Sequence, residues 1–248
     1  MAKLSVNVNK VATLRNTRSI GIPSVLHAAK LCLDAGAHGI TVHPRPDQRH
    51  IRPHDVYEIA ELLKRYPHTE FNIEGNPFHE FMHFAREVRP TQCTLVPDSP
   101  EASTSDHGWD LRRERVRLLP IVKQLHEYGC RVSVFMDPQP QAMALAAELG
   151  VDRVELYTAP YAEAFAAGDA DAGEAYAETA QRAAELGLAV NAGHDLNLEN
   201  LPPLIRKIPF IAEVSIGHAL IGDSLEFGLP LTVQKYLSAA AVSDIRSA

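Results

Sequence analysis

Cysteine is scarce in this sequence, with only Cys32, Cys93 and Cys130 among 248 residues. An odd number of thiols, each in an apolar helix or strand context, does not suit a disulfide framework, so we expect three core residues in a protein of the reducing cytoplasm. No run of about eighteen apolar residues is present, and the N-terminal segment enters a strand without an apolar signal region. We therefore expect a soluble protein that is not exported.

Basic charge is also deficient, because the net charge is −7. An acidic field argues against a nucleic-acid partner and against an anionic membrane surface. A phosphorylated ligand would therefore have to be held by local groups rather than by the field of the whole molecule.

What the chain does contain is a strict alternation of strand and helix patterns, and 46% of its residues are hydrophobic. The expected strands are Leu4–Asn9, Gly39–His43, Glu70–Glu74, Gln92–Val96, Arg131–Asp137, Arg153–Thr158, Ala189–Gly193 and Glu213–His218. The expected helices are Ser24–Ala35, His54–Tyr66, Phe78–Val88, Leu111–Tyr128, Gln139–Leu149, Asp171–Leu186, Leu198–Lys207 and Ser224–Ala241. Eight such units predict a single (β/α)8 barrel domain over residues 1–248, with an open doubly wound sheet as the alternative.

Two segments exceed the minimal repeat, and we expect both as loops on the catalytic side of the barrel. Val11–Ile22, with Arg15 and Arg18, suits a flap that closes over the barrel mouth. Pro97–Asp110 is a polar segment after the fourth strand. Pro120 is expected to kink its helix or divide it in two.

Polar side chains gather where the expected strands end, and in a parallel barrel these ends converge on one mouth. The candidates are Asn7, Asn9 and Lys10 after strand one, His43, Arg45 and His50 after strand two, Glu74 on strand three, His194 after strand seven, and Gly217 and His218 on strand eight. The other histidines are expected at surface or partly buried positions.

Glu74 ends an apolar stretch, where desolvation should raise the pKa of its carboxyl group and suit it to proton transfer. A salt bridge to Arg45 or another cation is the alternative. Phosphate binding is expected from Arg18 and Arg45 and from the turn at 216–222, with a helix beginning at Asp223-Ser224.

Two other chemistries remain open at this point. His43, Glu74, His194 and His218 are residue types that bind zinc, although the Asn and Arg neighbours suit anionic organic ligands better. A Schiff-base lysine would have to be Lys10, which lies near a strand end.

The residues at these positions resemble those of the pyridoxine 5′-phosphate synthase family, which closes the ring in vitamin B6 biosynthesis. The segments that carry the resemblance are 6–18, 39–45 with His50, 72–74, 95–97, 190–194 and 216–222. That family condenses 1-deoxy-D-xylulose 5-phosphate with 3-amino-2-oxopropyl phosphate to pyridoxine 5′-phosphate, phosphate and water. The substrates form the imine between themselves, so the resemblance implies no metal, organic cofactor or enzyme lysine.

The resemblance also implies roles for individual residues. His43 would be a proton acceptor, Glu74 a second acid/base group and His194 a proton donor. The implied substrate-binding residues are Arg45, His50 and Thr104 for the deoxyxylulose phosphate, Asn7, Arg18, Asp195, Gly217 and His218 for the aminoketone phosphate, and Asn9 and Lys10 near the first strand. Asn9-Lys10 replaces a usual Asp-His pair, and Asp195 replaces a usual Gly.

The resemblance further implies that the enzyme is a homo-octamer and that its partners are small phosphorylated substrates. Two other functions stay open: a metal-assisted barrel hydrolase, and a barrel that binds a phosphorylated metabolite without turnover.

Overall fold

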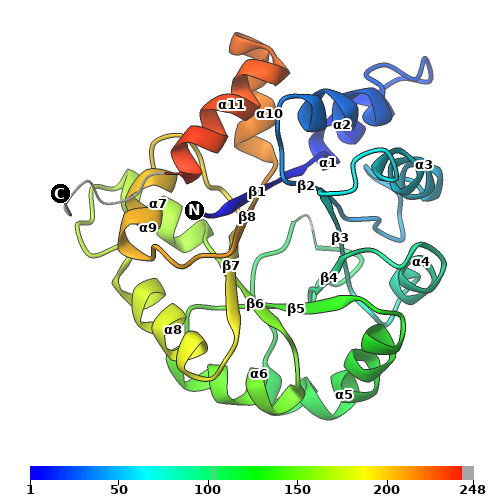
Figure 1. Ribbon diagram of the computed structural model, residues 1–248. Helices are drawn as coiled ribbons and strands as arrows, with labels where there is room; N and C mark the ends of the chain where they lie inside the picture. The colour runs from blue at the N-terminus through cyan, green and yellow to red at the C-terminus, as the bar shows by residue number, and fades with distance from the viewer. Residues whose placement is uncertain (103, 242–248) are drawn as a thin grey trace.

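A computed structural model describes residues 1–102 and 104–241, in which eight parallel strands close into a barrel in chain order (Figure 1). The strands are β1 Lys3–Asn7, β2 Gly39–Val42, β3 Glu70–Gly75, β4 Gln92–Leu95, β5 Arg131–Met136, β6 Arg153–Tyr157, β7 Ala189–Gly193 and β8 Glu213–Ile216. Pairing of β1 with β8, from Lys3–Glu213 to Val6–Ile216, closes the sheet. The predicted (β/α)8 barrel is confirmed, and the open sheet is excluded.

The helices surround the barrel and cover its outer face (Figure 1). They are α1 Asn9–Asn16, α2 Val25–Asp34, α3 Pro53–Leu63, α4 Phe81–Val88, α5 Leu111–Glu127, α6 Met143–Leu149, α7 Ala159–Ala166, α8 Glu174–Glu185, α9 Leu201–Lys207, α10 His218–Phe227 and α11 Leu229–Ala240, with a 3-10 turn at Pro140–Ala142 before α6. Apolar strand residues and the inner helix faces form one core, which includes the side chain of Tyr236.

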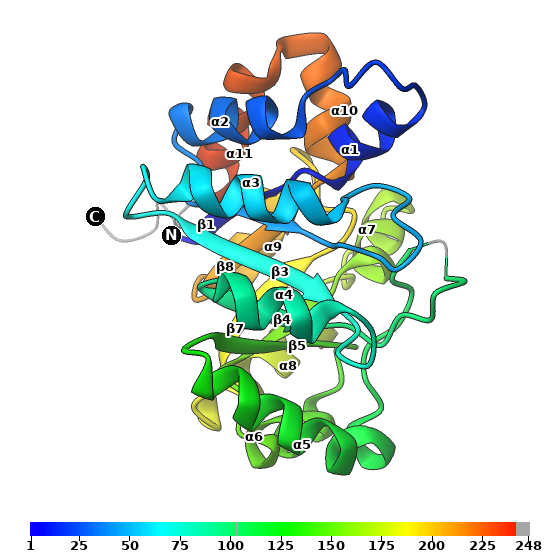
Figure 2. The ribbon, with the colours of Figure 1, turned by 90° about the vertical axis from the view of Figure 1, so that its right-hand side faces the viewer.

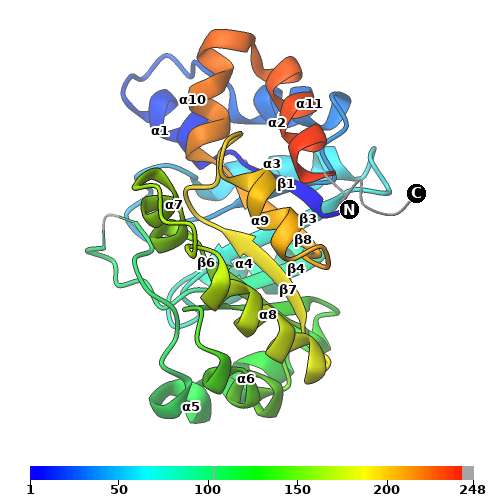
Figure 3. The ribbon, with the colours of Figure 1, turned by 90° about the vertical axis from the view of Figure 1, so that its left-hand side faces the viewer.

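Additional segments lie at one end of this barrel. Figures 2 and 3 show α1 and α7 beyond the end toward which the β3 arrow points, whereas the N-terminus lies at the opposite end. The carboxyl ends of the strands therefore open beneath these extra helices. The prediction of additional helical and loop segments on that side is confirmed.

The segment after β1 differs from its prediction. β1 ends at Asn7, whose side-chain Oδ1 accepts a hydrogen bond from Asn9 N at 3.0 Å, and α1 starts at Asn9 rather than after a longer strand. Helix α1 also takes up the first part of the expected flap at 11–22. Arg15 is 7% exposed and forms a buried ion pair with Asp55 of α3, so it is a structural residue and not part of a flap.

The helices differ from the predictions at three places: α5 is not divided, one predicted helix is two, and one helix was not predicted. α5 continues through Pro120 as a single helix, and Pro120 is exposed, so the hydrogen bond it cannot donate lies on the solvent side. The expected helix at 224–241 is two helices, α10 and α11, which meet at Gly228 with φ of 77°. Helix α7 was not expected, because its short Ala-rich pattern adjoins an apolar strand.

Ser103, within the predicted loop Pro97–Asp110, and residues 242–248, at the end of the predicted domain, lie outside the described residues. The described part of that loop returns to the barrel through Trp109, whose indole Nε1 donates to Leu95 O at 2.9 Å. Beside it, a Cβ on Gly108 would lie 2.3 Å from Asp137 N, so only glycine allows this close approach.

The prediction that the three cysteines are core residues is confirmed, since Cys32, Cys93 and Cys130 are free and buried in the core. In the described part of the chain, none of the helices combines the length and apolar composition needed to cross a membrane.

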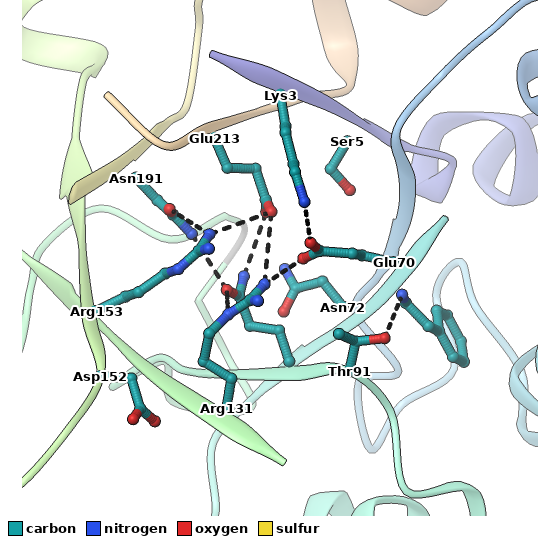
Figure 4. Close-up of polar contacts among 12 residues, drawn as sticks. Lys3, Ser5, Glu70, Asn72, Thr91, Arg131, Asp152, Arg153, Asn191 and Glu213 are labelled. Atoms are coloured by element: carbon teal, nitrogen blue, oxygen red, sulfur yellow. Dashed lines mark hydrogen bonds and ion pairs between the residues drawn. The ribbon is translucent and has the colours of Figure 1, made fainter. Parts of the chain in front are cut away.

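The barrel interior is polar at the end where the strands begin. Figure 4 shows a cluster, here called the floor network, that links the starting residues of several strands through charged and amide groups. Its members are Lys3, Glu70, Gln92, Arg131, Arg153, Asn191 and Glu213. The floor network lies at the amino ends of the strands, opposite the mouth.

Candidate active site

The mouth of the barrel contains a cavity of about 460 Å³. All of the predicted site residues except Arg18 line it: Asn7, Asn9, Lys10, His43, Arg45, His50, Glu74, Thr104, His194, Asp195, Gly217 and His218. They come from the ends of β1, β2, β3, β7 and β8 and from the loop after β4. The prediction that polar strand ends converge is confirmed. The four histidines expected there, His43, His50, His194 and His218, are the histidines that line this cavity.

His43 follows β2 directly and is 6% exposed. Its backbone N–H donates to Asn9 Oδ1 at 3.0 Å, which joins the start of α1 to the second strand. Burial, and then the nearby positive charge of Arg45, hold the pKa of His43 well below its ordinary value. Its imidazole is therefore neutral at neutral pH and able to accept a proton.

Glu74 of β3 lies beside His43, with 3.9 Å between Glu74 Oε2 and His43 Nδ1. Its side chain is 13% exposed, and Ser215 Oγ and Asn7 Nδ2 each lie 3.4 Å from one carboxylate oxygen. Burial, followed by the negative charge of Asp98, raises the pKa of Glu74 to about 8. The predicted upward shift is confirmed, and this carboxyl group is largely protonated at neutral pH.

The alternative salt bridge of Glu74 with Arg45 is not found, because Arg45 has another carboxylate partner. Its guanidinium forms a buried ion pair with Asp98 and donates from Nη1 to Ala102 O at 2.9 Å. Asp98 follows β4 and also accepts from Ser105 Oγ at 2.8 Å. The ion pair therefore fixes the orientation of Arg45 at the mouth.

His50 lies next to this group, with its ring centroid 6.1 Å from that of His43. Burial first, and then the charge of Arg45, lower the pKa of His50 to about 4, so the ring is neutral. Because Nδ1 accepts from Ile51 N at 2.9 Å, the ring hydrogen is carried by Nε2. A neutral histidine in this tautomer is a hydrogen-bond donor.

His194 stands across the cavity, at the end of β7. Its backbone has φ of 92°, and Thr158 Oγ1 holds the turn by donating to Gly193 O at 2.8 Å and to His194 O at 2.6 Å. The ring lies edge-on to Tyr157, with centroids 5.2 Å apart. Thr104 Oγ1 lies 3.0 Å from Nε2, so the loop after β4 meets the β7 end here.

The β8 side of the cavity is formed by a helix N-terminus. α10 begins at His218 with Gly217 as its N-cap residue, so the predicted start at Asp223-Ser224 is wrong by five residues. A Cβ on Gly217 would lie 3.1 Å from Asn7 Cβ, which shows how closely β1 and β8 approach at this point. Exposed backbone N–H groups and the partial positive charge of α10 suit an anion here.

Glu155 is one residue of this cavity that was not predicted from the sequence. It lies within β6 and is 3% exposed, and its Oε2 has no hydrogen-bond partner. Burial, and then Glu74, raise the pKa of Glu155 well above its ordinary value. A carboxylate between Val154 and Leu156, in a strand covered on both faces, is the signal that the sequence offers. Glu155 lies within β6, whereas the site residues were expected at the strand ends.

Arg49 and Ser215 also line the cavity and were not assigned a role from the sequence. Arg49 Nη1 and Nη2 donate to Ala102 O and Pro100 O at 2.7 and 2.8 Å, so Arg45 and Arg49 both hold the loop after β4. Among the residues that the structure describes, no group of three or more His, Cys, Asp and Glu is placed to hold a metal ion.

Comparison with known proteins places this site in a family. The family model described as "Pyridoxal phosphate biosynthesis protein PdxJ" matches residues 4–241. The chain belongs to this family.

Curated members of the family are similar over almost the whole chain. The pyridoxine 5′-phosphate synthase of Albidiferax ferrireducens is 56% identical over an alignment of 245 residues, and the match covers 96% of this chain and 97% of the relative. That of Porphyromonas gingivalis is 50% identical over 236 residues, 95% of this chain and 98% of the relative.

Solved structures share the fold at low sequence identity. A tryptophan synthase from M. tuberculosis has a TM-score of 0.69 at 12% identity, covering 97% of this chain and 93% of that one. A phosphoribosyl anthranilate isomerase has a TM-score of 0.59 at 14% identity, covering 97% and 98%. Both likenesses concern the barrel fold alone.

One residue of the expected PdxJ-type site lies outside the cavity. Arg18 is exposed in the segment between α1 and α2, and it is not among the residues that line the mouth. The assignment of Arg18 to substrate binding is therefore not reproduced by the geometry of this structure.

Proposed function

We propose that this chain acts as a pyridoxine 5′-phosphate synthase, as its curated relatives are named. It would condense 1-deoxy-D-xylulose 5-phosphate with 3-amino-2-oxopropyl phosphate to pyridoxine 5′-phosphate, phosphate and water. The amine of the second substrate forms an imine with the ketone of the first. The protein then has to position two phosphate esters and move protons between defined atoms.

The observation that carries this proposal is the pair formed by His43 and Glu74. The two groups lie 3.9 Å apart, the imidazole has a lowered pKa and the carboxyl group a pKa of about 8. At neutral pH a base and an acid therefore stand side by side, as a condensation with alternating proton removal and donation requires.

In this proposal His43 accepts protons, Glu74 exchanges a proton as the second acid/base group, and His194 donates a proton from the opposite side. His194 reaches the same cavity from β7. Glu155 is held neutral by its burial, so it can donate a hydrogen bond to an oxygen that gains negative charge.

The two ends of the cavity would hold the two phosphorylated substrates. Arg45, neutral His50 and Thr104 form the end assigned to the deoxyxylulose phosphate. The aminoketone phosphate is assigned to Asn7, Asp195, Gly217 and His218, whereas Asn9 and Lys10, near the first strand, are assigned to further contacts with the deoxyxylulose phosphate. At the aminoketone side the N-terminus of α10 supplies backbone N–H groups.

Arg18 is assigned to the aminoketone phosphate as well, which requires the segment after α1 to move toward the mouth. We predict that Arg18→Ala raises the KM for this substrate by about 10-fold, because one charge-assisted contact is lost. Initial rates at varied aminoketone concentration would measure this. An unchanged KM would remove Arg18 from the binding site.

The proposal extends to the setting of the enzyme: small phosphorylated substrates in the cytoplasm, no nucleic-acid or membrane partner, no metal or organic cofactor, and a homo-octamer. Light scattering coupled to gel filtration would test the assembly. The expected mass is that of eight chains of 27.2 kDa. A monomer that retains full activity would contradict the octamer.

The decisive experiment is an assay of the purified chain with both substrates, with and without a chelator, following the pyridoxine 5′-phosphate chromophore and released phosphate. Product formed at the same rate in chelator supports the synthase. Activity lost with the chelator and restored by zinc would favour a metal-assisted hydrolase. Binding of the substrates without turnover would favour a barrel that only binds a phosphorylated metabolite.

A further inference from the structure

We propose that the Asp195 side chain is a positioning residue for His194, holding the imidazole in the tautomer that presents Nε2 to the cavity. This inference rests on the proposed function, in which His194 is the proton donor. It gives Asp195 a task different from contact with the aminoketone phosphate. The reacting nitrogen of His194 would then be chosen by its neighbour in the chain.

The two nitrogens of the His194 ring have different partners. Nδ1 lies 2.8 Å from Asp195 Oδ2, and Nε2 lies 3.0 Å from Thr104 Oγ1, a hydroxyl that can donate or accept. An ionised carboxylate only accepts hydrogen bonds, so Nδ1 must carry a hydrogen. Proton exchange with a substrate is thereby confined to Nε2, on the side of the loop after β4. This nitrogen carries a lone pair in the neutral ring, so it takes up a proton first and His194 donates that proton from the imidazolium form.

Asp195 is ionised under ordinary conditions. The hydrogen bond from His194 is the main cause that lowers the pKa of the Asp195 carboxyl group, against the opposing effect of burial. His218 of α10 and Lys10 of α1 face the same carboxylate and lower its pKa further. Tyr157 of β6 faces it as well, and the carboxylate contributes to the raised pKa of that phenol.

The backbone at His194 and Asp195 adopts a conformation that costs energy for residues with a side chain. His194 and Asp195 are consecutive non-glycine residues with φ of 92° and 57°. Such conformations cost energy for residues with a Cβ and little for glycine. The turn is held by Thr158 and by Asn200, whose Nδ2 donates to Asp195 O at 3.1 Å. These contacts hold the backbone, and they need no carboxylate at position 195.

The test compares Asp195→Gly with Asp195→Asn. Glycine removes the acceptor and suits the positive φ, so this variant should fold at least as well as the parent. Asparagine has the same shape and still offers Oδ1 to the Nδ1–H group of His194. We expect kcat to fall about 10-fold in Asp195→Gly, as for other groups that orient a reacting side chain, and less than about threefold in Asp195→Asn.

The tautomer itself can be observed without substrate. In protein labelled with ¹⁵N-histidine, with the His194 signals identified by their absence in His194→Gln, the parent and Asp195→Asn should show hydrogen on Nδ1 in the neutral ring. Asp195→Gly should show a shift toward hydrogen on Nε2. The KM for each substrate should change less than the kcat in both variants.

Two results would overturn the inference. One is an unchanged His194 tautomer in Asp195→Gly, and the other is an equal loss of kcat in the glycine and asparagine variants. Absence of synthase activity in the parent protein would instead overturn the proposed function. The tautomer measurement would still decide the role of Asp195 in that case, because it uses no substrate.

Discussion

At the mouth of the barrel, burial leaves the imidazole of His43 without its acidic proton and the neighbouring carboxyl group of Glu74 with one. Desolvation disfavours charge on both His43 and Glu74, so the imidazole loses its proton and the carboxyl group keeps one. Desolvation thus makes the imidazole a base and the carboxyl group an acid, because the first is charged when protonated and the second when deprotonated. The arrangement depends on β2 and β3 ending side by side.

The first residue-scale prediction concerns His43→Ala. We expect kcat to fall by at least about 100-fold, the usual contribution of a positioned general base, while circular dichroism shows an intact barrel. His27→Ala, at an exposed position on α2, is the control and should keep full activity. Near-normal turnover of the His43 variant would show that another group accepts the proton.

The second residue-scale prediction concerns the pH dependence of stability. Glu74 has a pKa of about 8 in the folded chain against an ordinary value of 4.5, so between these pH values the folded chain binds more protons than the unfolded one. The contribution of this group to stability therefore falls as the pH rises from about 4.5 to 8. Glutamine cannot ionise, and the melting temperature of Glu74→Gln relative to the parent should rise between pH 6 and 9. A difference that is independent of pH would contradict the burial argument.

At the scale of single elements, α1 is attached to the barrel by one buried ion pair. Arg15 of α1 pairs with Asp55 of α3, and Asp55 also accepts from Arg52 N at 2.8 Å at the start of that helix. Arg15 Nη2 donates in addition to His50 O at 3.1 Å. The position of α1, and with it that of Asn9 and Lys10, is therefore linked to the loop that carries His50.

Arg15→Ala should accordingly destabilise the protein. Removal of one partner leaves Asp55 buried without its counter-charge, at a cost of about 3–5 kcal/mol. Urea unfolding followed by tryptophan fluorescence would measure the change. Arg18→Ala, three residues further along and exposed, should change the free energy of unfolding by less than about 0.5 kcal/mol. Equal effects of the two variants would refute a structural role for the ion pair.

At the scale of the whole molecule, the two ends of the barrel have different tasks. The floor network closes the amino ends: Arg131 pairs with Glu70 and lies 3.8 Å from Glu213 Oε2, and Arg153 lies 3.5 Å from the same oxygen (Figure 4). No predicted site residue belongs to it. The ion pairs of the floor network link the strands to one another, whereas the charged side chains at the mouth line the cavity that would hold a substrate.

We predict that Arg131→Ala lowers the free energy of unfolding by about 2–4 kcal/mol, because Glu70 and Glu213 lose the guanidinium between them. Lys3→Ala is the matched control: Lys3 also pairs with Glu70, but its side chain is 46% exposed, so its loss should cost less than about 1 kcal/mol. Denaturant unfolding measures both. A fall in kcat of the folded Arg131 variant would contradict the separation of floor and mouth.

The sequence alone predicted the barrel and most of its mouth, because β-α alternation is a local periodicity and polar residues after apolar strands stand out. All of the strands were located, with bounds that differ from the structure by at most two residues. Glu155 was missed because a mid-strand carboxylate has no local signature. The start of α10 at His218 was missed because Gly217 and Gly222 suit a turn.

The sequence by itself determined which residues could reach a common point, since chain order and strand polarity set the strand ends of a closed barrel. Only the tertiary structure decided which charges are compensated: Arg45 by Asp98, and Arg15 by Asp55. The physical reason is that pairing and desolvation depend on distances between side chains. Segments far apart in the chain set those distances.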